Sequence, residues 1–260
     1  MSTQQPETTT RPQLAAASSA LHGGSARPAG RRRGQPRSWP IPAALVALSF
    51  IPLTAGSLRL LQLAGGPALM PADQRFTGFP VALVIHIVGA AVFALVGALQ
   101  FLPRLRRGRR SWHRRAGRIV AGAGLAVAGS ALWLTLVYQP QPGTGDLLYV
   151  LRLVFGSAMA ACLVLGFTAI RRRDIAAHRA WMIRGYALGL AAGTQVFTQG
   201  IGEAVLGTGE VRGDLAKGAA WVINLLVAEW AIRHTTSGRR RRRSPRPRAT
   251  EAAGASSWTT

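Results

Sequence analysis

Long apolar runs alternate with short polar connections through the central part of the chain. A bilayer core about 30 Å thick needs about 20 apolar residues at 1.5 Å of helical rise each. Six runs approach that length, and they cover residues 41–63, 80–102, 117–138, 148–170, 183–203 and 216–233. The third and fourth runs have uncharged cores of full length, whereas the sixth is shortened by Lys217 and Glu229. This pattern predicts an all-α integral membrane bundle of six transmembrane helices within residues 41–233.

The two ends of the chain have a different composition. Residues 1–40 and 234–260 are rich in Arg, Ser, Pro and Gly and show no apolar periodicity, so they cannot bury enough surface to offset chain entropy. We expect both to be disordered basic tails. About forty polar residues precede the first apolar run, which has the length of a full span, so a cleaved signal peptide is not expected.

Basic residues are segregated from the apolar runs. The chain has 32 basic residues, all Arg except Lys217, against nine acidic ones, and its formal net charge is +23, although only 16% of its residues are charged. The N-terminal tail, the second and fourth connections and the C-terminal end together hold 27 of the 32. Since positive residues in short connections stay on the cytoplasmic side, both termini are expected in the cytoplasm. We expect these segments to contact anionic phospholipid headgroups and no nucleic acid, because they are tethered beside a membrane.

The second apolar run carries a polar face. Its residues His86, Gly89, Phe93, Gly97 and Gln100 follow one another at spacings of three or four and therefore share one side of a helix. An imidazole, an amide and two glycines on one face favour the bundle interior over lipid. His86 is accordingly either a ligand or proton carrier near the outer leaflet, or an interhelical hydrogen bond that fixes packing.

Two cytoplasmic connections resemble each other. SWHRRAGRIV at 111–120 and AHRAWMIRGY at 177–186 both place His followed by Arg before an outward-running helix. The 65 residues between His113 and His178 match one hairpin of two spans, which suggests a repeated helical hairpin.

These two motifs allow three interpretations. They could bind an anion or lipid headgroup at a helix N-terminus through Arg114, Arg118, Arg179 and Arg184. The imidazoles of His113 and His178, or His86 with another partner, could instead ligate the iron of haem b, with arginines pairing the propionates. The third interpretation is that the arginines only strengthen the positive-inside signal.

Further polar residues are predicted inside the bundle. Arg59, Arg152 and Glu203 lie near the outer ends of their helices, where they could form a structural bridge or bind an anionic substrate. Asn224 and Glu229 add polarity to the last helix. The chain has no CxxC, HExxH, GxSxG or phosphate-loop motif, so no catalytic residue or metal site is predicted and enzymatic activity stays open.

The motifs together resemble a known family. His86 with Gly89 and Gln100, then HRRAGR, then HRAWMIR, then Asn224 and Glu229 are similar to the bacterial membrane proteins grouped as domain of unknown function 2306, over about residues 80–232. The resemblance implies a multi-pass bundle in a bacterial inner membrane, and it implies no particular activity. A b-type haem redox protein and a transporter of small molecules or lipids remain the functional alternatives.

Overall fold

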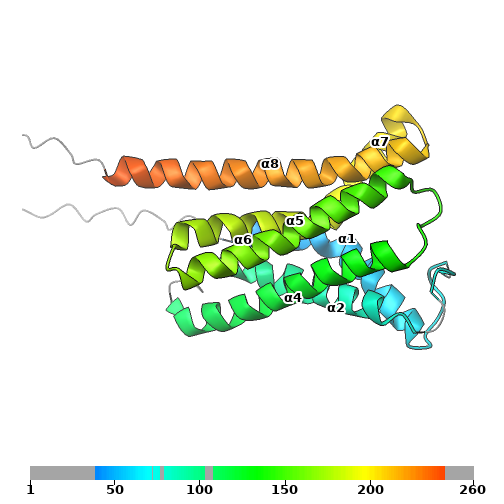
Figure 1. The fold of residues 1–260 in the computed structure, drawn as a ribbon, viewed down its shortest axis with the longest axis horizontal. Helices are drawn as coiled ribbons and strands as arrows, with labels where there is room; N and C mark the ends of the chain where they lie inside the picture. Colours follow the sequence, from blue (N-terminus) through cyan, green and yellow to red (C-terminus); the bar gives the residue numbers. More distant parts are fainter. Residues whose placement is uncertain (1–38, 72, 77–78, 103–107, 244–260) are drawn as a thin grey trace, which may run out of the picture. The chain divides into compact units, whose positions relative to one another are not determined.

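The described part of the protein consists of helices and their connections. The computed structural model describes residues 39–71, 73–76, 79–102 and 108–243. Within these ranges there is no strand, and the helices are α1 (Pro40–Leu63), α2 (Val81–Gln100), α4 (Arg110–Val137), α5 (Asp146–Arg171), α6 (Ile175–Gly189), α7 (Ala191–Leu206) and α8 (Glu210–Arg243) (Figure 1). The predicted all-α fold is confirmed.

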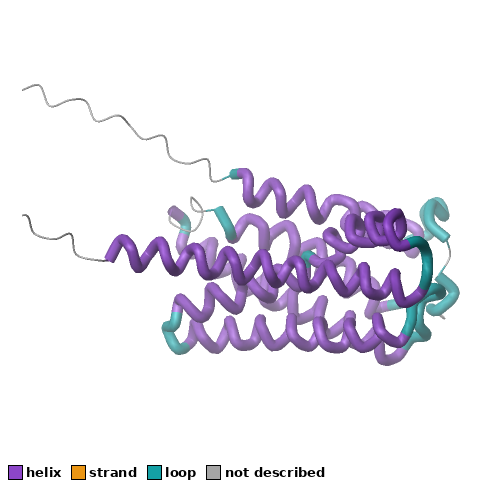
Figure 2. Tube along the Cα trace, turned by 90° about the horizontal axis from the view of Figure 1, so that it is seen from above, coloured by secondary structure: helices purple, strands orange, loops and turns teal. Residues whose placement is uncertain are grey.

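The helices pack mainly against their neighbours in sequence. Helix α2 contacts α4, α4 contacts α5, and α5 contacts α6, while α8 packs against α5, α6 and α7, and α1 packs against α2 and α7. The connections therefore gather at the two ends of a helical bundle (Figure 2). We call the end where α4 and α6 begin the basic end, and the end where α5 and α8 begin the distal end.

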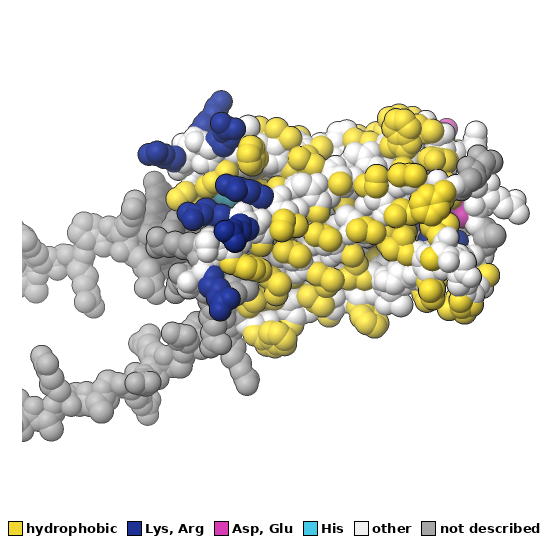
Figure 3. Space-filling view, turned by 90° about the horizontal axis from the view of Figure 1, so that it is seen from below, with side chains coloured by type: hydrophobic (Ala, Val, Ile, Leu, Met, Phe, Trp, Pro, Cys, Tyr) yellow, Lys and Arg dark blue, Asp and Glu magenta, His cyan; other side chains and the backbone are white. Residues whose placement is uncertain are grey.

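The lateral surface of the bundle is apolar. Five helices, α1, α2, α4, α5 and α8, are long and apolar enough to cross a membrane, and only 11% to 28% of their most apolar windows is buried inside the protein. Large side chains such as Phe50, Val154 and Leu226 are exposed, and on the face shown in Figure 3 apolar atoms cover the flank between an end rich in Lys and Arg and the opposite end. Because exposing so wide an apolar band to water would be unfavourable, this surface is suited to contact with lipid.

The predicted fifth span, 183–203, is wrong as a single helix. It is divided at Leu190 into α6 and α7, neither of which is long enough to cross a membrane alone. In an unbroken helix the Ala187 carbonyl would accept a hydrogen bond from the amide four residues on, but here it accepts one from Nδ2 of Asn224 at 2.9 Å. Thr194 Oγ1 donates to Oδ1 of the same asparagine at 2.8 Å. Asn224 on α8 thus replaces a backbone partner at the interruption.

Two helix boundaries also differ from the prediction. Helix α4 begins at Arg110 rather than 117, and α8 covers 210–243 rather than 216–233, so part of the predicted C-terminal tail is helical. Arginine is a good helix former, and long basic side chains extend from a helix end toward the interface, so charge ends the apolar run without ending the helix. Residues 1–38 and 244–260, where the tails were predicted, lie outside the described residues.

The core is organised around Phe93 of α2, which is 2% exposed. A Cβ on Gly124 of α4 would lie 2.6 Å from its ring, and one on Gly189 of α6 would lie 2.5 Å from it. These glycines are 65 residues apart, the same separation as His113 and His178, so α4 and α6 present equivalent positions at one depth. This agrees with the predicted repeated hairpin.

Candidate functional site

A pocket at the distal end contains two of the polar residues singled out from the sequence. His86 of α2 and Arg152 of α5 line a cavity of about 190 Å³. Arg75 from the α1–α2 connection, Tyr138 at the end of α4 and Gln141 also contribute polar groups to its lining. We call it the arginine pocket. Its remaining lining is Phe76, Leu83, Ala131, Leu134 and Thr135, and it contains no acidic residue.

His86 is held in place by α4. Its Nδ1 lies 3.3 Å from the carbonyl oxygen of Val127 and 3.2 Å from Oγ of Ser130, whose hydroxyl also donates to Val127 O at 3.1 Å. Gly89, one turn further along α2, allows this approach, because a Cβ there would lie 3.1 Å from Val127. With Nδ1 engaged by α4, Nε2 is the ring nitrogen available to a ligand. The inward orientation predicted for this helix face is confirmed.

Arg152 is an arginine inside a membrane-crossing helix. It is partly buried, and its guanidinium forms no hydrogen bond or ion pair with any residue in the described ranges. Electrostatically it is influenced by Arg75, a like charge, and by Asp214 on α8. An unpaired arginine at this depth is costly, since intramembrane charges are normally matched by a counter-charge. Within the described ranges no carboxylate forms an ion pair with this guanidinium, which leaves its N–H groups able to bind an anion.

Two residues of the α1–α2 connection, Arg75 and Phe76, line the pocket. Arg75 Nε and Nη2 donate to the two carboxylate oxygens of Asp73 at 2.8 and 2.6 Å. This hydrogen bonding lowers the pKa of Asp73 and raises that of Arg75, so both groups stay charged at neutral pH. Phe76 packs edge-on against Tyr138, with ring centroids 4.8 Å apart, and thereby fixes the connection over α4.

The expected bridge between Arg59 or Arg152 and Glu203 is not formed in the described structure. Arg59 Nη1 instead donates to Oε1 of Gln62 at 3.1 Å and to the Pro71 carbonyl at 3.0 Å, holding the first connection against α1. The reason is the order of the helices: α8 contacts both α5 and α7, which do not contact each other, so Arg152 and Glu203 belong to separate pockets.

His113 and His178 each occupy the fourth position of their helix, α4 and α6. Nδ1 of His178 lies 2.8 Å from the carbonyl oxygen of Gly166 on α5. Helices α4 and α6 contact each other directly, and buried Phe93 and Tyr186 fill the interior that they share with α2. Neither imidazole lines the arginine pocket or the cavity between α7 and α8, so haem ligation gains no structural support.

The predicted anion-binding arginines at the basic end differ in their surroundings. Arg114, Arg118 and Arg179 are exposed. Arg184 instead forms a two-point ion pair with Glu229 of α8, Nε to Oε1 at 2.5 Å and Nη2 to Oε2 at 3.1 Å. This pair joins α6 to α8 on the basic-end side of the Asn224 contact, so Arg184 has a structural partner within the chain.

The α6 N-terminus has its own cap, because Asp174 accepts a hydrogen bond from the Ala177 amide at 2.9 Å. An external anion would have to compete with that carboxylate. Gln100, predicted as a buried polar residue, has both amide atoms buried and without a partner among the described residues.

Sequence reasoning missed the role of Asp214. It is fully buried and accepts hydrogen bonds from the backbone amides of Gly145, at 2.9 Å, and Leu148, at 3.0 Å. An aspartate on α8 therefore caps the N-terminus of α5, whose own N-cap residue is a glycine without a side chain. A glycine at this N-cap position indicates that the helix needs a capping group from elsewhere. Because Asp214 is 69 residues away in the sequence, no local pattern identifies it as that group.

Comparison with known proteins assigns the chain to a family. The family described as "predicted membrane protein (DUF2306)" matches residues 83–232, from α2 to α8. The chain belongs to this family. No curated protein and no solved structure has a detectable match to it. The family assignment supports a membrane-embedded protein in contact with lipid, and the matched region includes His86 and Arg152 of the arginine pocket.

Proposed function

We propose that this DUF2306 protein binds a small anion, carrying a carboxylate or phosphate group, in the arginine pocket. The observation that carries the proposal is the Arg152 guanidinium, which lacks a partner among the described residues in a pocket without acidic residues. Arg75, whose charge is balanced by Asp73, still lines the pocket with its guanidinium, and His86 adds a ring nitrogen that becomes a donor when protonated. A cavity of about 190 Å³ suits a small solute or the end of a headgroup better than a large cofactor.

Binding tests this proposal directly. The purified protein in detergent is titrated with inorganic phosphate and with succinate, and the stabilisation against heat is measured as a function of concentration. Arg152→Gln should weaken binding at least about tenfold, because a charge-assisted hydrogen bond contributes roughly 1.5–3 kcal/mol. Arg212→Gln is the matched control, since Arg212 lies at the same end but outside the arginine pocket. If neither anion stabilises the folded wild type, or if both variants bind alike, the proposal is wrong.

The proposal includes an orientation in the bacterial inner membrane. The arginines of the basic end should face the cytoplasm and its anionic headgroups, so the arginine pocket opens outward. In a Cys162→Ser background, an impermeant maleimide applied to spheroplasts should label Gln139→Cys and not Arg172→Cys. The reverse labelling pattern would overturn this orientation.

Transport of the bound anion is a second candidate function. The division between α6 and α7 favours it, because discontinuous membrane helices are common where transporters bind and release substrate. In proteoliposomes, uptake of radiolabelled phosphate or succinate that depends on Arg152 would support transport. Binding without uptake would leave the protein as a receptor or sensor.

A further inference from the structure

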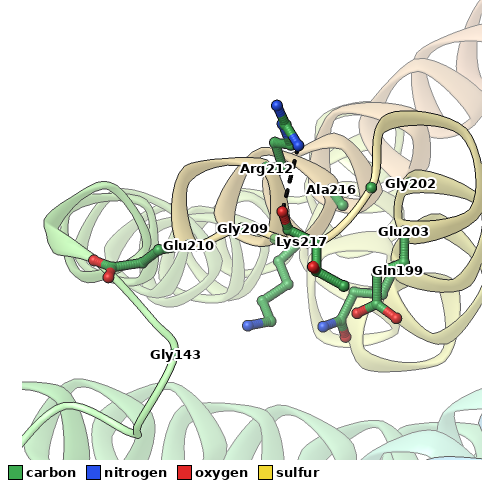
Figure 4. Close-up of a pocket in the computed structure, with 12 residues that line it drawn as sticks. Gly143, Gln199, Gly202, Glu203, Gly209, Glu210, Arg212, Ala216 and Lys217 are labelled. Atoms are coloured by element: carbon green, nitrogen blue, oxygen red, sulfur yellow. Dashed lines mark hydrogen bonds between the residues drawn. The ribbon is translucent and has the colours of Figure 1, made fainter.

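A second cavity lies at the distal end, between α7 and α8. It has a volume of about 270 Å³ and is bounded by the last turns of α7, the 207–209 turn and the first turns of α8. The side chains of Gln199 and Glu203 on α7 and of Lys217 on α8 project into the same gap (Figure 4). We call it the α7–α8 pocket.

The three side chains are available to a ligand. Among the described residues, no hydrogen bond or ion pair joins the Gln199 amide, the Glu203 carboxylate or the Lys217 ammonium to another group. The charges that act on Lys217 from a distance are those of Asp214, then Arg152, then Glu203. Acid and base thus face one cavity without forming an ion pair with each other. A ligand that carries both a positive and a negative group could pair with Glu203 and Lys217 at the same time.

The walls of this pocket are fixed by contacts outside it. Nε2 of Gln195 donates to the Lys217 carbonyl at 3.3 Å, which sets the register of α7 against α8. Gly202 brings the helices close, since a Cβ there would lie 3.1 Å from Ala216. Arg212 Nη1 donates to the Thr208 carbonyl at 3.3 Å and closes the turn between the helices. The positions of the two charges are therefore built into the helix pairing.

We propose that the α7–α8 pocket binds a small zwitterion that carries a primary ammonium and a carboxylate or phosphate group. Glu203 receives the ammonium, Lys217 receives the oxyanion, and the Gln199 amide can donate to one and accept from the other. This ligand class differs from that of the arginine pocket, which has no acidic residue, so the inference does not rest on the proposed function. The same chemistry occurs in amino-acid-like solutes and in the headgroup of an aminated phospholipid.

The test compares ligands that carry one charge or two. Protein in phosphatidylcholine nanodiscs is titrated by calorimetry with β-alanine and phosphoethanolamine, and with acetate, methylammonium and phosphocholine as comparators. At least one of the two zwitterions should bind at least about tenfold more tightly than every comparator. Acetate lacks the ammonium, methylammonium lacks the oxyanion, and the quaternary ammonium of phosphocholine has no N–H to donate. Glu203→Gln and Lys217→Gln should each weaken that binding at least about tenfold.

Glu210→Gln is the matched control. Glu210 also lines the pocket, but its side chain projects toward Gly145 at the start of α5, away from Glu203 (Figure 4). Binding should be unchanged in this variant. Each variant is used only if its melting temperature shows a folded protein, and Glu203→Asp, which keeps the charge, should retain more binding than Glu203→Gln.

A lipid arm separates the two sources of the ligand. Native mass spectrometry of protein reconstituted with equal amounts of phosphatidylethanolamine and phosphatidylcholine should show retained phosphatidylethanolamine, lost in Glu203→Gln, if the ligand is a headgroup. Zwitterion binding in calorimetry without lipid retention assigns a free solute. If neither assay shows selective binding in the wild type, or if Glu203→Gln and Lys217→Gln bind as the wild type does, the inference is overturned.

Discussion

Replacing Asn224 by Leu tests how the interrupted fifth crossing is stabilised. The change conserves size while removing the amide that donates to the Ala187 carbonyl at 2.9 Å and accepts from Thr194 at 2.8 Å. Leucine cannot replace either bond, and it leaves the Ala187 carbonyl, freed by the division between α6 and α7, without its donor.

The expected loss follows from these contacts. Side-chain hydrogen bonds between membrane helices average about 0.6 kcal/mol, and a buried polar group left unpaired costs roughly 1–3 kcal/mol. The two lost bonds and one unpaired carbonyl together predict that Asn224→Leu lowers the free energy of unfolding by about 2–4 kcal/mol. Thr194→Val removes only the shared bond and should cost about 0.6 kcal/mol.

Equilibrium unfolding by SDS in mixed micelles measures both changes. In a double-mutant cycle the Asn224→Leu and Thr194→Val losses should fall short of additivity by about 0.6 kcal/mol, because they remove the same bond. Thr198→Val is the control, since its hydroxyl bonds only within its own helix, to the carbonyls of Thr194 and Gln195 at 3.3 Å. A loss below about 0.5 kcal/mol for Asn224→Leu would refute this account of the interruption.

Three further predictions concern single positions. Gly193→Ala should destabilise the protein by about 1–3 kcal/mol in the same assay, because its new Cβ would overlap the Leu48 backbone carbonyl of α1. Arg173→Gly should stabilise it by roughly 1 kcal/mol, because Arg173 adopts a φ of 61° at the end of α5, where glycine is unstrained. Replacing Asp73 by Asn should reduce thermal stability at neutral pH. Because Arg75 lowers the Asp73 pKa below its ordinary value of 3.8, that difference should persist above about pH 4 and vanish as the pH falls through the lowered pKa.

Controls make each of these predictions decisive. Gly200→Ala meets nothing within 4 Å and should be neutral or stabilising, so equal losses at Gly200 and Gly193 would contradict the steric argument. Arg172→Gly changes a residue with an ordinary φ of −80° and should not stabilise the protein, so a shared gain with Arg173→Gly would point to charge rather than strain. Asp146→Asn is the control for Asp73→Asn, since Asp146 forms no ion pair within the described ranges, and an equal loss of stability at neutral pH in both variants would contradict the role given to the Asp73–Arg75 pair.

The chain's sequence by itself determined the membrane class, the approximate position of the helices and the segregation of charge. These features depend on local composition, because about twenty apolar residues bury their surface in lipid whatever their neighbours are. The inward face of α2 was also predictable, since periodicity places His86 with Phe93 and Gly97 before any partner helix is known. Local composition did not predict the division of the fifth span at Leu190, because no proline or charged residue marks the end of α6 there.

Only the tertiary structure decided which polar residues meet. Arg152 and Glu203 have similar predicted depth, yet α8 separates α5 from α7, so each joins a different pocket. Asp214 caps a helix that begins far earlier in the chain, at Asp146, and Asn224 completes the backbone of α6 from α8. Such partnerships depend on the order in which helices pack, and an apolar pattern specifies that a face is buried without specifying which helix covers it.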